Sequence, residues 1–318
     1  MSNISYLTSH ISPMQSLLFS IESYLYLQKE IFDLGNFELG EVEVKTFPDG
    51  ERYQRILSDV EGRNVVLLGG TPTDTDTLEL YDLASAIGKY GAKTLTIVSP
   101  YFGYSTMERA VKKGEVVTAK TRATLLSSIP KTGSRITFVL LDLHTEGLPH
   151  YFEGDVQATH LYCKEVIMDT CTEIAGKDFI LACTDAGRAK WVESLANDMG
   201  VNAAFVFKRR VSGDETMVTG ISADVAGKTV IIYDDMIRTG GSLINAAKSY
   251  KEAGASRIFA ITTHGLFTNN ALERLEKSGL FEKVFSTDTH PNTQTLLNHS
   301  LLSVKSVEKI IHKKITSS

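Results

Sequence analysis

The chain has 318 residues, and its 33 Lys and Arg against 38 Asp and Glu give a formal net charge of −5. A domain averages roughly 150 residues, so this length predicts about two domains. The mild acidity argues against a protein that binds a nucleic acid polymer, which usually carries a basic face. A hydrophobic content of 42% excludes a mainly disordered chain.

Targeting signals and cysteine chemistry are both sparse. No run approaches the roughly 18 uncharged apolar residues of a membrane helix. The amino-terminal region lacks the basic start of a secretory signal and is interrupted by Pro13 and Glu22. Cys163, Cys171 and Cys183 form no CxxC pair, which favours free buried thiols in a reducing compartment. We therefore expect a cytoplasmic protein that is not associated with a membrane.

In the first half of the chain, apolar strands alternate with a helical stretch. Strands are expected over residues 64–69, 94–98 and 135–141. A helix is expected over residues 77–90, where apolar residues recur at helical spacing and Gly91 follows as a C-cap.

The second half repeats this rhythm. Strands are expected over residues 179–182, 203–207, 229–233 and 257–262, and helices over residues 190–199 and 242–253. The strands are continuous apolar runs, which indicates parallel sheets covered on both faces. The alternation in both halves predicts an α/β protein of two doubly wound parallel-sheet domains, residues 1–160 and 161–303. A carboxyl-terminal helix over residues 304–318 is expected to pack back on the first domain.

One segment joins an apolar strand, two carboxylates, a glycine-rich turn and a helix. Its polar residues are Asp234, Asp235, Arg238, Thr239, Gly240, Gly241 and Ser242. Glycine N–H groups, hydroxyl groups and the positive end of the helix dipole can all face an anion. The paired aspartates can bind ribose hydroxyls or a magnesium ion. The alternative is a strand-to-helix turn with solvated aspartates.

This segment resembles the phosphoribosyl diphosphate (PRPP) motif of type I phosphoribosyltransferases and PRPP synthetases. Further motifs match the synthetases in family order: Phe47-Pro48-Asp49-Gly50-Glu51, Pro100-Tyr101-Phe102-Gly103-Tyr104, Thr118-Ala119-Lys120, Asp142-Leu143-His144, Asp185-Ala186-Gly187, Lys208-Arg209-Arg210 and Thr263-His264-Gly265-Leu266-Phe267. Together they cover most of the chain. The chain is therefore identified as similar to the ribose-phosphate diphosphokinase family.

The resemblance implies two α/β domains of phosphoribosyltransferase-like topology with the active site between them. It also implies a reaction in which ATP gives its β,γ-diphosphoryl group to the C1 hydroxyl of ribose 5-phosphate, with Mg²⁺ as the cofactor. Because the transferred group is densely charged, cations and positioning dominate such catalysis.

The resemblance assigns residues to this reaction. Lys208 and Arg210 match a catalytic basic pair on a flexible loop, and residues 212–216 continue as a mobile loop that could exclude water. Taken alone, these basic residues could equally form a surface patch. His144 and Asp185 match positions associated with Mg²⁺ and nucleotide phosphates, and His144 is also counted as catalytic and ATP-binding.

The resemblance also assigns ATP recognition to Phe47, Asp49, Glu51 and Arg109. In the family, the element containing the first three recognises adenine in a neighbouring subunit's site. This implies a homo-oligomer, dimer-based or hexameric. A hairpin turn centred on Asp49 is the alternative, and both interpretations can hold together.

Five positions depart from the family pattern. Thr106 and Met107 replace an arginine and a glutamine associated with ATP, and Arg188 replaces a glycine. Trp191 replaces an arginine, and Arg238 replaces an aspartate of the phosphate loop. The last change reverses a charge and adds five hydrogen-bond donors. The tryptophan supplies an aromatic plate for stacking on a base or for packing a core.

These departures leave three functions open. An acceptor whose 5-phosphate is esterified, such as ADP-ribose, could meet Arg238 or Arg188 with its extra phosphate. A catalytically silent regulatory subunit of a true synthetase would explain Thr106 and Met107, although the retained His144 argues against it. A phosphoribosyltransferase with PRPP as donor fits the paired domains and the other motifs poorly.

Overall fold

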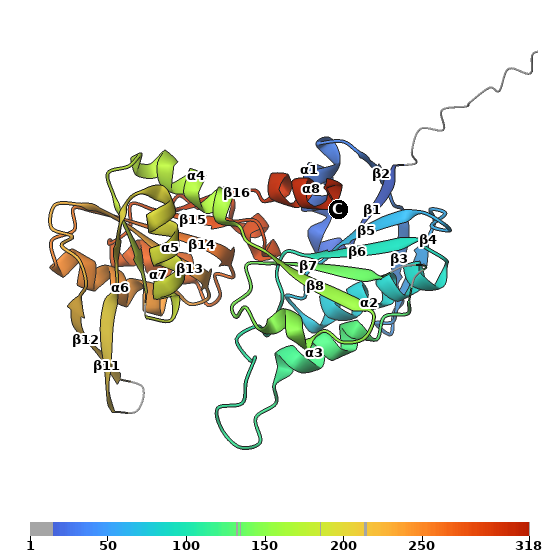
Figure 1. Cartoon of the computed structure of the whole chain (residues 1–318), viewed down its shortest axis with the longest axis horizontal. Helices are drawn as coiled ribbons and strands as arrows, with labels where there is room; N and C mark the ends of the chain where they lie inside the picture. Colours follow the sequence, from blue (N-terminus) through green and yellow to red (C-terminus); the bar gives the residue numbers. More distant parts are fainter. Residues whose placement is uncertain (1–14, 132, 134, 185, 213–214, 318) are drawn as a thin grey trace, which may run out of the picture.

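The computed structural model describes residues 15–131, 133, 135–184, 186–212 and 215–317, without the side chains of residue 186 and residues 207–219. The described residues form two six-stranded sheets and two short antiparallel ribbons. Figure 1 shows two α/β lobes side by side, the first built on the sheet that contains β1 and the second on the sheet that contains β9.

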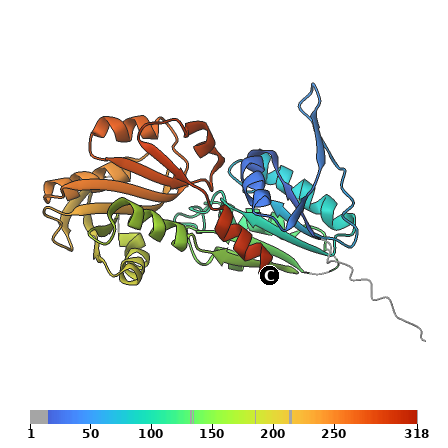
Figure 2. The same cartoon turned by 90° about the horizontal axis from the view of Figure 1, so that it is seen from above.

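The first lobe is a parallel sheet in the order β2-β1-β5-β6-β7-β8. Its strands are β1 Ser16–Ser20, β2 Phe37–Leu39, β5 Asn64–Leu68, β6 Thr94–Ser99, β7 Ile136–Leu141 and β8 Val156–Leu161, and its helices are α1 Leu25–Asp33, α2 Asp74–Lys89 and α3 Thr118–Ser127. The antiparallel ribbon of β3 (Val42–Thr46) and β4 (Arg52–Ile56) stands out from this lobe (Figure 2).

The second lobe is a parallel sheet in the order β10-β9-β13-β14-β15-β16. Its strands are β9 Ile180–Cys183, β10 Asn202–Ala204, β13 Thr229–Ile237, β14 Arg257–Gly265, β15 Lys283–Thr287 and β16 Leu302–Lys305, and its helices are α4 Lys164–Ala175, α5 Ala189–Met199, α6 Gly241–Glu252 and α7 Ala271–Ser278. The last helix, α8 Glu308–Thr316, follows β16 and packs on the first lobe. The second ribbon pairs β11 (Val206–Ser212) with β12 (Glu215–Ile221). Short 3₁₀ turns are Glu22–Tyr24, Leu148–Tyr151, Ala186–Arg188 and Pro291–Leu296.

The two sheets share one topology. In each, the chain moves from the first strand to one edge and then returns to the opposite side, so the direction reverses beside that first strand. This confirms the predicted doubly wound α/β fold class. In such sheets, ligands bind outside the carboxyl ends of the strands at the reversal point. The second lobe therefore presents a binding position at the ends of β9 and β13.

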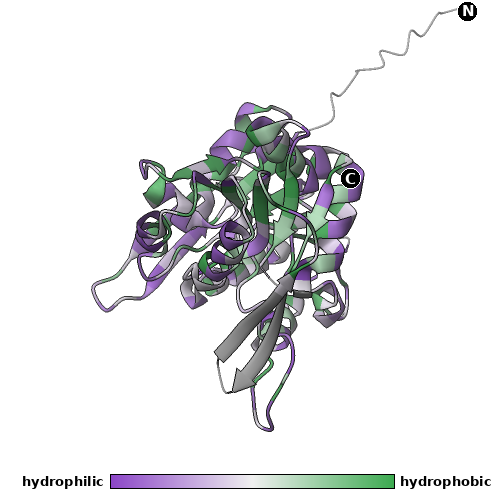
Figure 3. Ribbon diagram, turned by 90° about the vertical axis from the view of Figure 1, so that its left-hand side faces the viewer, coloured by the Kyte–Doolittle hydropathy of each residue, from purple (hydrophilic) through white to green (hydrophobic). Residues whose placement is uncertain are grey.

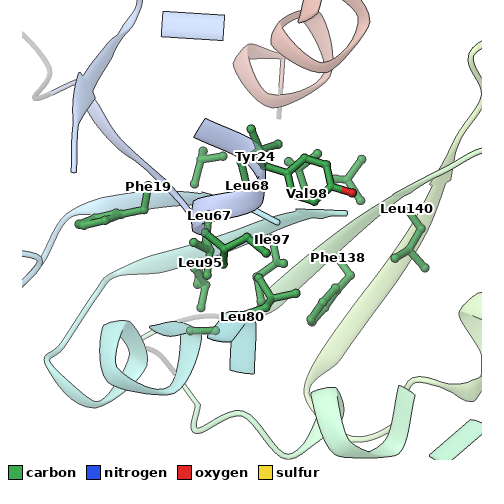
Figure 4. Close-up of a cluster of buried hydrophobic side chains, with 14 of the residues drawn as sticks. Phe19, Tyr24, Leu67, Leu68, Leu80, Leu95, Ile97, Val98, Phe138 and Leu140 are labelled. Carbon is green, nitrogen blue, oxygen red and sulfur yellow. The ribbon is translucent and has the colours of Figure 1, made fainter. Parts of the chain in front are cut away.

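Apolar side chains explain why these strands are central. Figure 3 shows largely hydrophobic strands inside, surrounded by helices that carry both hydrophilic and hydrophobic residues. In the first lobe, Phe19, Leu67 and Phe138 are fully buried between neighbouring strands and helices (Figure 4). Burying one such side chain stabilises the fold by about 1.5–3 kcal/mol. Ile310 and Ile311 of helix α8 belong to this same core, and the helix lies against α1 (Figure 1).

Buried polar contacts join the lobes at the carboxyl ends of their strands. The Thr263 hydroxyl donates to the Asp142 carboxylate at 2.6 Å, and the Asp142 carbonyl lies 3.0 Å from His264 Nε2. The Tyr24 hydroxyl donates to the Thr289 carbonyl at 3.0 Å. Burial lowers the pKa of His264, which keeps this imidazole neutral at the junction. The two sheets thus meet at the ends where ligands are expected.

Several predicted elements differ in their bounds from the structure. Strand β13 does not end before the aspartates but continues through Ile237, because the equally long β14 keeps pairing with it as far as Gly265. The strand predicted over 203–207 is split, since the chain leaves the sheet after Ala204 and starts the β11–β12 ribbon. Helix α2 begins earlier than predicted, at Asp74, because the Thr73 hydroxyl caps it by accepting the Asp76 N–H.

The carboxyl-terminal helix is shorter than predicted. Residues 302–305 form the edge strand β16, and α8 covers only Glu308–Thr316. The predicted boundary between the domains, at residues 160 and 161, falls at the end of β8 and stays a proposal.

Candidate active site

The turn between β13 and α6 surrounds a cavity of about 320 Å³. Gly240 adopts a left-handed conformation with φ +76°, and a Cβ there would lie 3.2 Å from the Leu275 side chain. Glycine is therefore required for the turn that points the first N–H groups of α6 at the cavity. The structure places all seven residues predicted to bind ribose phosphate around this cavity: Asp234, Asp235, Arg238, Thr239, Gly240, Gly241 and Ser242.

The loop after β7 reaches this cavity from the first lobe. His144 lines it, and its Nδ1 lies 2.7 Å from the Asp235 carboxylate. The Arg188 guanidinium pairs with the same carboxylate oxygen. Burial by itself would raise the pKa of Asp235, but the hydrogen bond from His144 and the charge of Arg188 outweigh it and lower the pKa to about 2. Asp235 therefore stays ionised although only 4% of its side chain is exposed.

A residue that the sequence analysis did not single out fixes the other aspartate. The Thr184 hydroxyl at the end of β9 donates to Asp234 at 3.0 Å. The Asp235 N–H donates to the second oxygen of Asp234 at 3.1 Å. These bonds tie together the two strands at the reversal point of the sheet. The position of Thr184 directly after a predicted strand could have revealed it.

Arg238 connects the cavity wall to the first lobe. Its guanidinium donates to the Thr106 hydroxyl at 3.1 Å, and both residues line the cavity. Two of the five positions that depart from the family pattern are thus in direct contact. The turn between β13 and α6, residues 238–242, is called the phosphate turn below after its predicted ligand. A charged side chain on this turn is thus held from across the junction of the lobes.

The residues predicted to recognise adenine do not line this cavity. Phe47, Asp49 and Glu51 lie at the turn of the β3–β4 ribbon, where the Phe47 N–H donates to the Glu51 carbonyl at 2.8 Å. The predicted hairpin turn is therefore confirmed. Phe47 is 48% exposed, and Arg109 is 79% exposed and pairs with Glu108. Within this chain, the structure does not bring these four residues to the phosphate turn.

The basic pair lies on a strand rather than on the loop that we predicted. Lys208 and Arg210 belong to β11, which pairs antiparallel with β12, and their side chains are outside the described part of the structure. Of the loop predicted over 212–216, the described residues belong to the two strands, with Ser212 opposite Glu215, and residues 213 and 214 lie outside the described part. Asp185 lies outside the described residues.

A magnesium ion fits this donor set only if most of its ligands come from water and substrate rather than from the protein. Among the described residues, no group of three His, Cys, Asp or Glu side chains could hold a metal. Mg²⁺, however, commonly uses one or two carboxylates and takes its other ligands from water and substrate phosphates. Asp234 lines the cavity beside His144 and supplies one such carboxylate.

Trp191 both packs on a neighbouring aromatic ring and lines a cleft. One face stacks on Tyr233 with ring centroids 4.2 Å apart and an angle of 20° between the planes. The residue also borders a second cleft, which shares His144 with the cavity at the phosphate turn.

Comparisons with known proteins agree with this geometry. Residues 16–129 match the N-terminal domain of ribose phosphate pyrophosphokinase, and residues 194–316 match the phosphoribosyl synthetase-associated domain. A ribose-phosphate pyrophosphokinase of Fusobacterium nucleatum is 32% identical over 295 residues, covering 91% of this chain and 92% of the relative. One of Pyrococcus abyssi is 34% identical over 255 residues, covering 80% and 85%.

A solved structure extends the match to the fold. The phosphoribosylpyrophosphate synthetase of Mycobacterium smegmatis is 25% identical, with a TM-score of 0.84 over 96% of this chain and 98% of that one. Fold and site thus define a diphosphotransferase enzyme with phosphoribosyltransferase-like topology. The chain belongs to the ribose-phosphate pyrophosphokinase family. None of the helices formed by the described residues is long and apolar enough to cross a membrane.

Proposed function

We propose that the protein transfers the β,γ-diphosphoryl group of ATP, with Mg²⁺, to the C1 hydroxyl of a ribose 5-phosphate moiety. In this step a bond forms between the C1 oxygen and the β-phosphorus. The bond from the β-phosphorus to the oxygen bridging the α-phosphorus breaks, AMP leaves, and the C1 hydroxyl loses its proton. The observation that carries the proposal is the phosphate turn of α6 beside two fixed aspartates at the reversal point of the sheet.

The acceptor is proposed to bind at this turn. Its 5-phosphate accepts hydrogen bonds from the backbone of Gly240 and Gly241 and from the Thr239 and Ser242 hydroxyls. Its ribose hydroxyls donate to the carboxylates of the two aspartates, which in the ionised form carry no proton and offer acceptors alone. The low pKa of Asp235 keeps it in that form near neutral pH.

The donor side of the reaction is proposed on the family resemblance. Lys208 and Arg210 would stabilise charge on the transferred group, and His144 with Asp185 would hold Mg²⁺. Phe47, Asp49, Glu51 and Arg109 would bind ATP. Because the first three lie on a projecting ribbon away from the cavity, they support a homo-oligomer in which one subunit completes the site of another. We retain a cytoplasmic location as a proposal.

The acceptor's identity is proposed from the changed cations. The family has an arginine where this chain has Thr106 and an aspartate where it has Arg238. Thr106 and Arg238 are in contact, so this chain carries its guanidinium on the wall of the cavity opposite to the one where the family pattern has it. Arg238 is thus available to a second phosphate on an extended acceptor such as ADP-ribose. Arg188 is less suited to that task, since its charge is engaged by Asp235 and it does not line the cavity.

A product analysis tests this proposal. The protein is incubated with ATP, Mg²⁺ and either ribose 5-phosphate or ADP-ribose, and products are identified by mass spectrometry. We expect AMP together with an acceptor whose mass has grown by a diphosphate group. If only ribose 5-phosphate is consumed, the proposal of an extended acceptor is rejected. Added chelator should stop either reaction by withdrawing Mg²⁺.

The alternative is a catalytically silent regulatory subunit. It is favoured by the loss of the ATP-associated residues at Thr106 and Met107, the latter 45% exposed and absent from the cavity lining. The contact between Arg238 and Thr106 weakens this alternative, because a cation is still present in the cavity. Absence of AMP formation with every ribosyl phosphate, combined with a changed activity of an added synthetase, would support it.

A further inference from the structure

A second cleft, here called the α5 cleft, lies beside the cavity at the phosphate turn. Its volume is about 700 Å³, which falls within the roughly 300–1,000 Å³ of small-molecule sites. Three segments form it: residues 144–147 after β7, residues 162 and 164 after β8, and residues 187–194 at the start of α5. It shares His144 with the neighbouring cavity, so the two spaces adjoin.

Two aromatic side chains line the α5 cleft, and each is supported from behind. Trp191 stacks on the buried ring of Tyr233. Tyr162 lies against His160, with ring centroids 3.9 Å apart, and its hydroxyl donates to Glu146 at 3.1 Å. A supported aromatic ring loses little conformational freedom when a ligand stacks on it. The cleft therefore offers fixed platforms to a planar ring.

The lining of the α5 cleft is also cationic. Among the described residues, Arg188, Lys164 and Lys190 line it, against the carboxylate of Glu146. Arg188 and Lys164 are already engaged in ion pairs. Lys190 is exposed and forms no hydrogen bond or ion pair with the described residues, so its ammonium group is available to an anion.

We propose that the α5 cleft binds a nucleotide, with its base against Trp191 and Tyr162 and its phosphate at Lys190. Aromatic platforms combined with a cation match a base that carries a phosphate better than either group alone. This ligand has two possible sources, a free nucleotide or the nucleotidyl part of an extended acceptor. The binding claim concerns a site separate from the phosphate turn and needs no turnover.

The chain makes this site directly observable, because Trp191 is its only tryptophan. The intact protein is titrated with AMP, with adenosine and with ribose 5-phosphate while tryptophan emission is recorded. We expect AMP to quench the emission saturably, adenosine to do so at concentrations at least tenfold higher, and ribose 5-phosphate to cause little quenching. An unchanged emission with millimolar AMP contradicts the proposal.

Two variants separate this site from other nucleotide sites. Lys190→Glu and Tyr162→Leu should each weaken the AMP response at least fivefold, while Lys177→Glu, an exposed control on the same lobe, should not change it. Calorimetric binding of ribose 5-phosphate by all three variants confirms that they are folded. An AMP response that is equal in all of them overturns the proposal, because AMP would then bind elsewhere.

Competition identifies the source of the nucleotide. If the cleft holds the tail of the acceptor, ADP-ribose displaces AMP from Trp191 and also ribose 5-phosphate from the phosphate turn. If it holds a free nucleotide, AMP and ribose 5-phosphate bind together, and ADP-ribose does not displace both. Either result supports the site, and neither depends on whether diphosphoryl transfer occurs.

Discussion

Replacement of Arg188 by methionine tests the electrostatics of the site. The substitution keeps much of the side-chain volume but removes the cation that faces Asp235, whose side chain is 4% exposed. Removing one partner of a buried ion pair costs about 3–5 kcal/mol, because the other charge remains buried without its partner. Since His144 still donates to Asp235 at 2.7 Å, we expect the lower end, about 3 kcal/mol.

Thermal unfolding measures this loss. At about 2 °C per kcal/mol for a large chain, the midpoint should fall by about 6 °C. The control is Arg257→Met, since Arg257 forms an exposed surface pair with Glu282 at 2.6 Å and its loss should cost at most about 1 kcal/mol.

A double variant separates charge from packing. Arg188→Met combined with Asp235→Asn removes both members of the pair and should be more stable than Arg188→Met alone, because no unpaired charge remains. The reasoning is refuted if Arg188→Met unfolds at the same temperature as Arg257→Met, or if the second substitution restores nothing.

Three further predictions concern catalysis, specificity and pH. Lys208→Ala should abolish turnover while the circular dichroism spectrum is unchanged, and near-normal turnover would remove Lys208 from the mechanism. The exchange Thr106→Arg with Arg238→Asp, which restores the family residues, should shift kcat/KM towards ribose 5-phosphate over ADP-ribose at least tenfold, and an unchanged ratio would dissociate this pair from acceptor choice. Burial raises the pKa of Asp288 to about 7, so the folded state keeps a proton that the unfolded chain loses near pH 4. Wild-type stability should therefore fall relative to Asp288→Asn as the pH rises from about 4 to 7, and a constant difference in urea unfolding would contradict this sign.

The sequence predicted the parts of the fold that depend on local pattern. Continuous apolar runs identified β5, β6 and β7 within one residue at either end, because buried parallel strands carry little else. The phosphate turn was equally predictable, since glycine adopts the left-handed conformation of Gly240 at the lowest steric cost. Strand ends were less predictable, because β13 continues through its aspartates only while β14 pairs with it.

Contacts between distant residues could not be predicted in the same way. The sequence offered Arg188 as one of two candidates to meet an extra phosphate, and the structure pairs its guanidinium with the buried carboxylate of Asp235. Nothing local indicates that Arg238 meets Thr106, 132 positions away. Trp191 was left between a stacking and a packing role, and the structure shows that one face packs on Tyr233 while the residue also lines a cleft.

The central claim is transfer of an intact diphosphoryl group to a ribosyl C1 oxygen. Phosphorus NMR of a reaction containing ATP, Mg²⁺ and a ribosyl 5-phosphate acceptor tests it most directly, because it distinguishes every phosphorus environment. The account predicts AMP as the adenylate product and a new diphosphate coupled to the anomeric carbon. Formation of ADP with a phosphomonoester at C1, or no consumption of ATP with either acceptor, would contradict it.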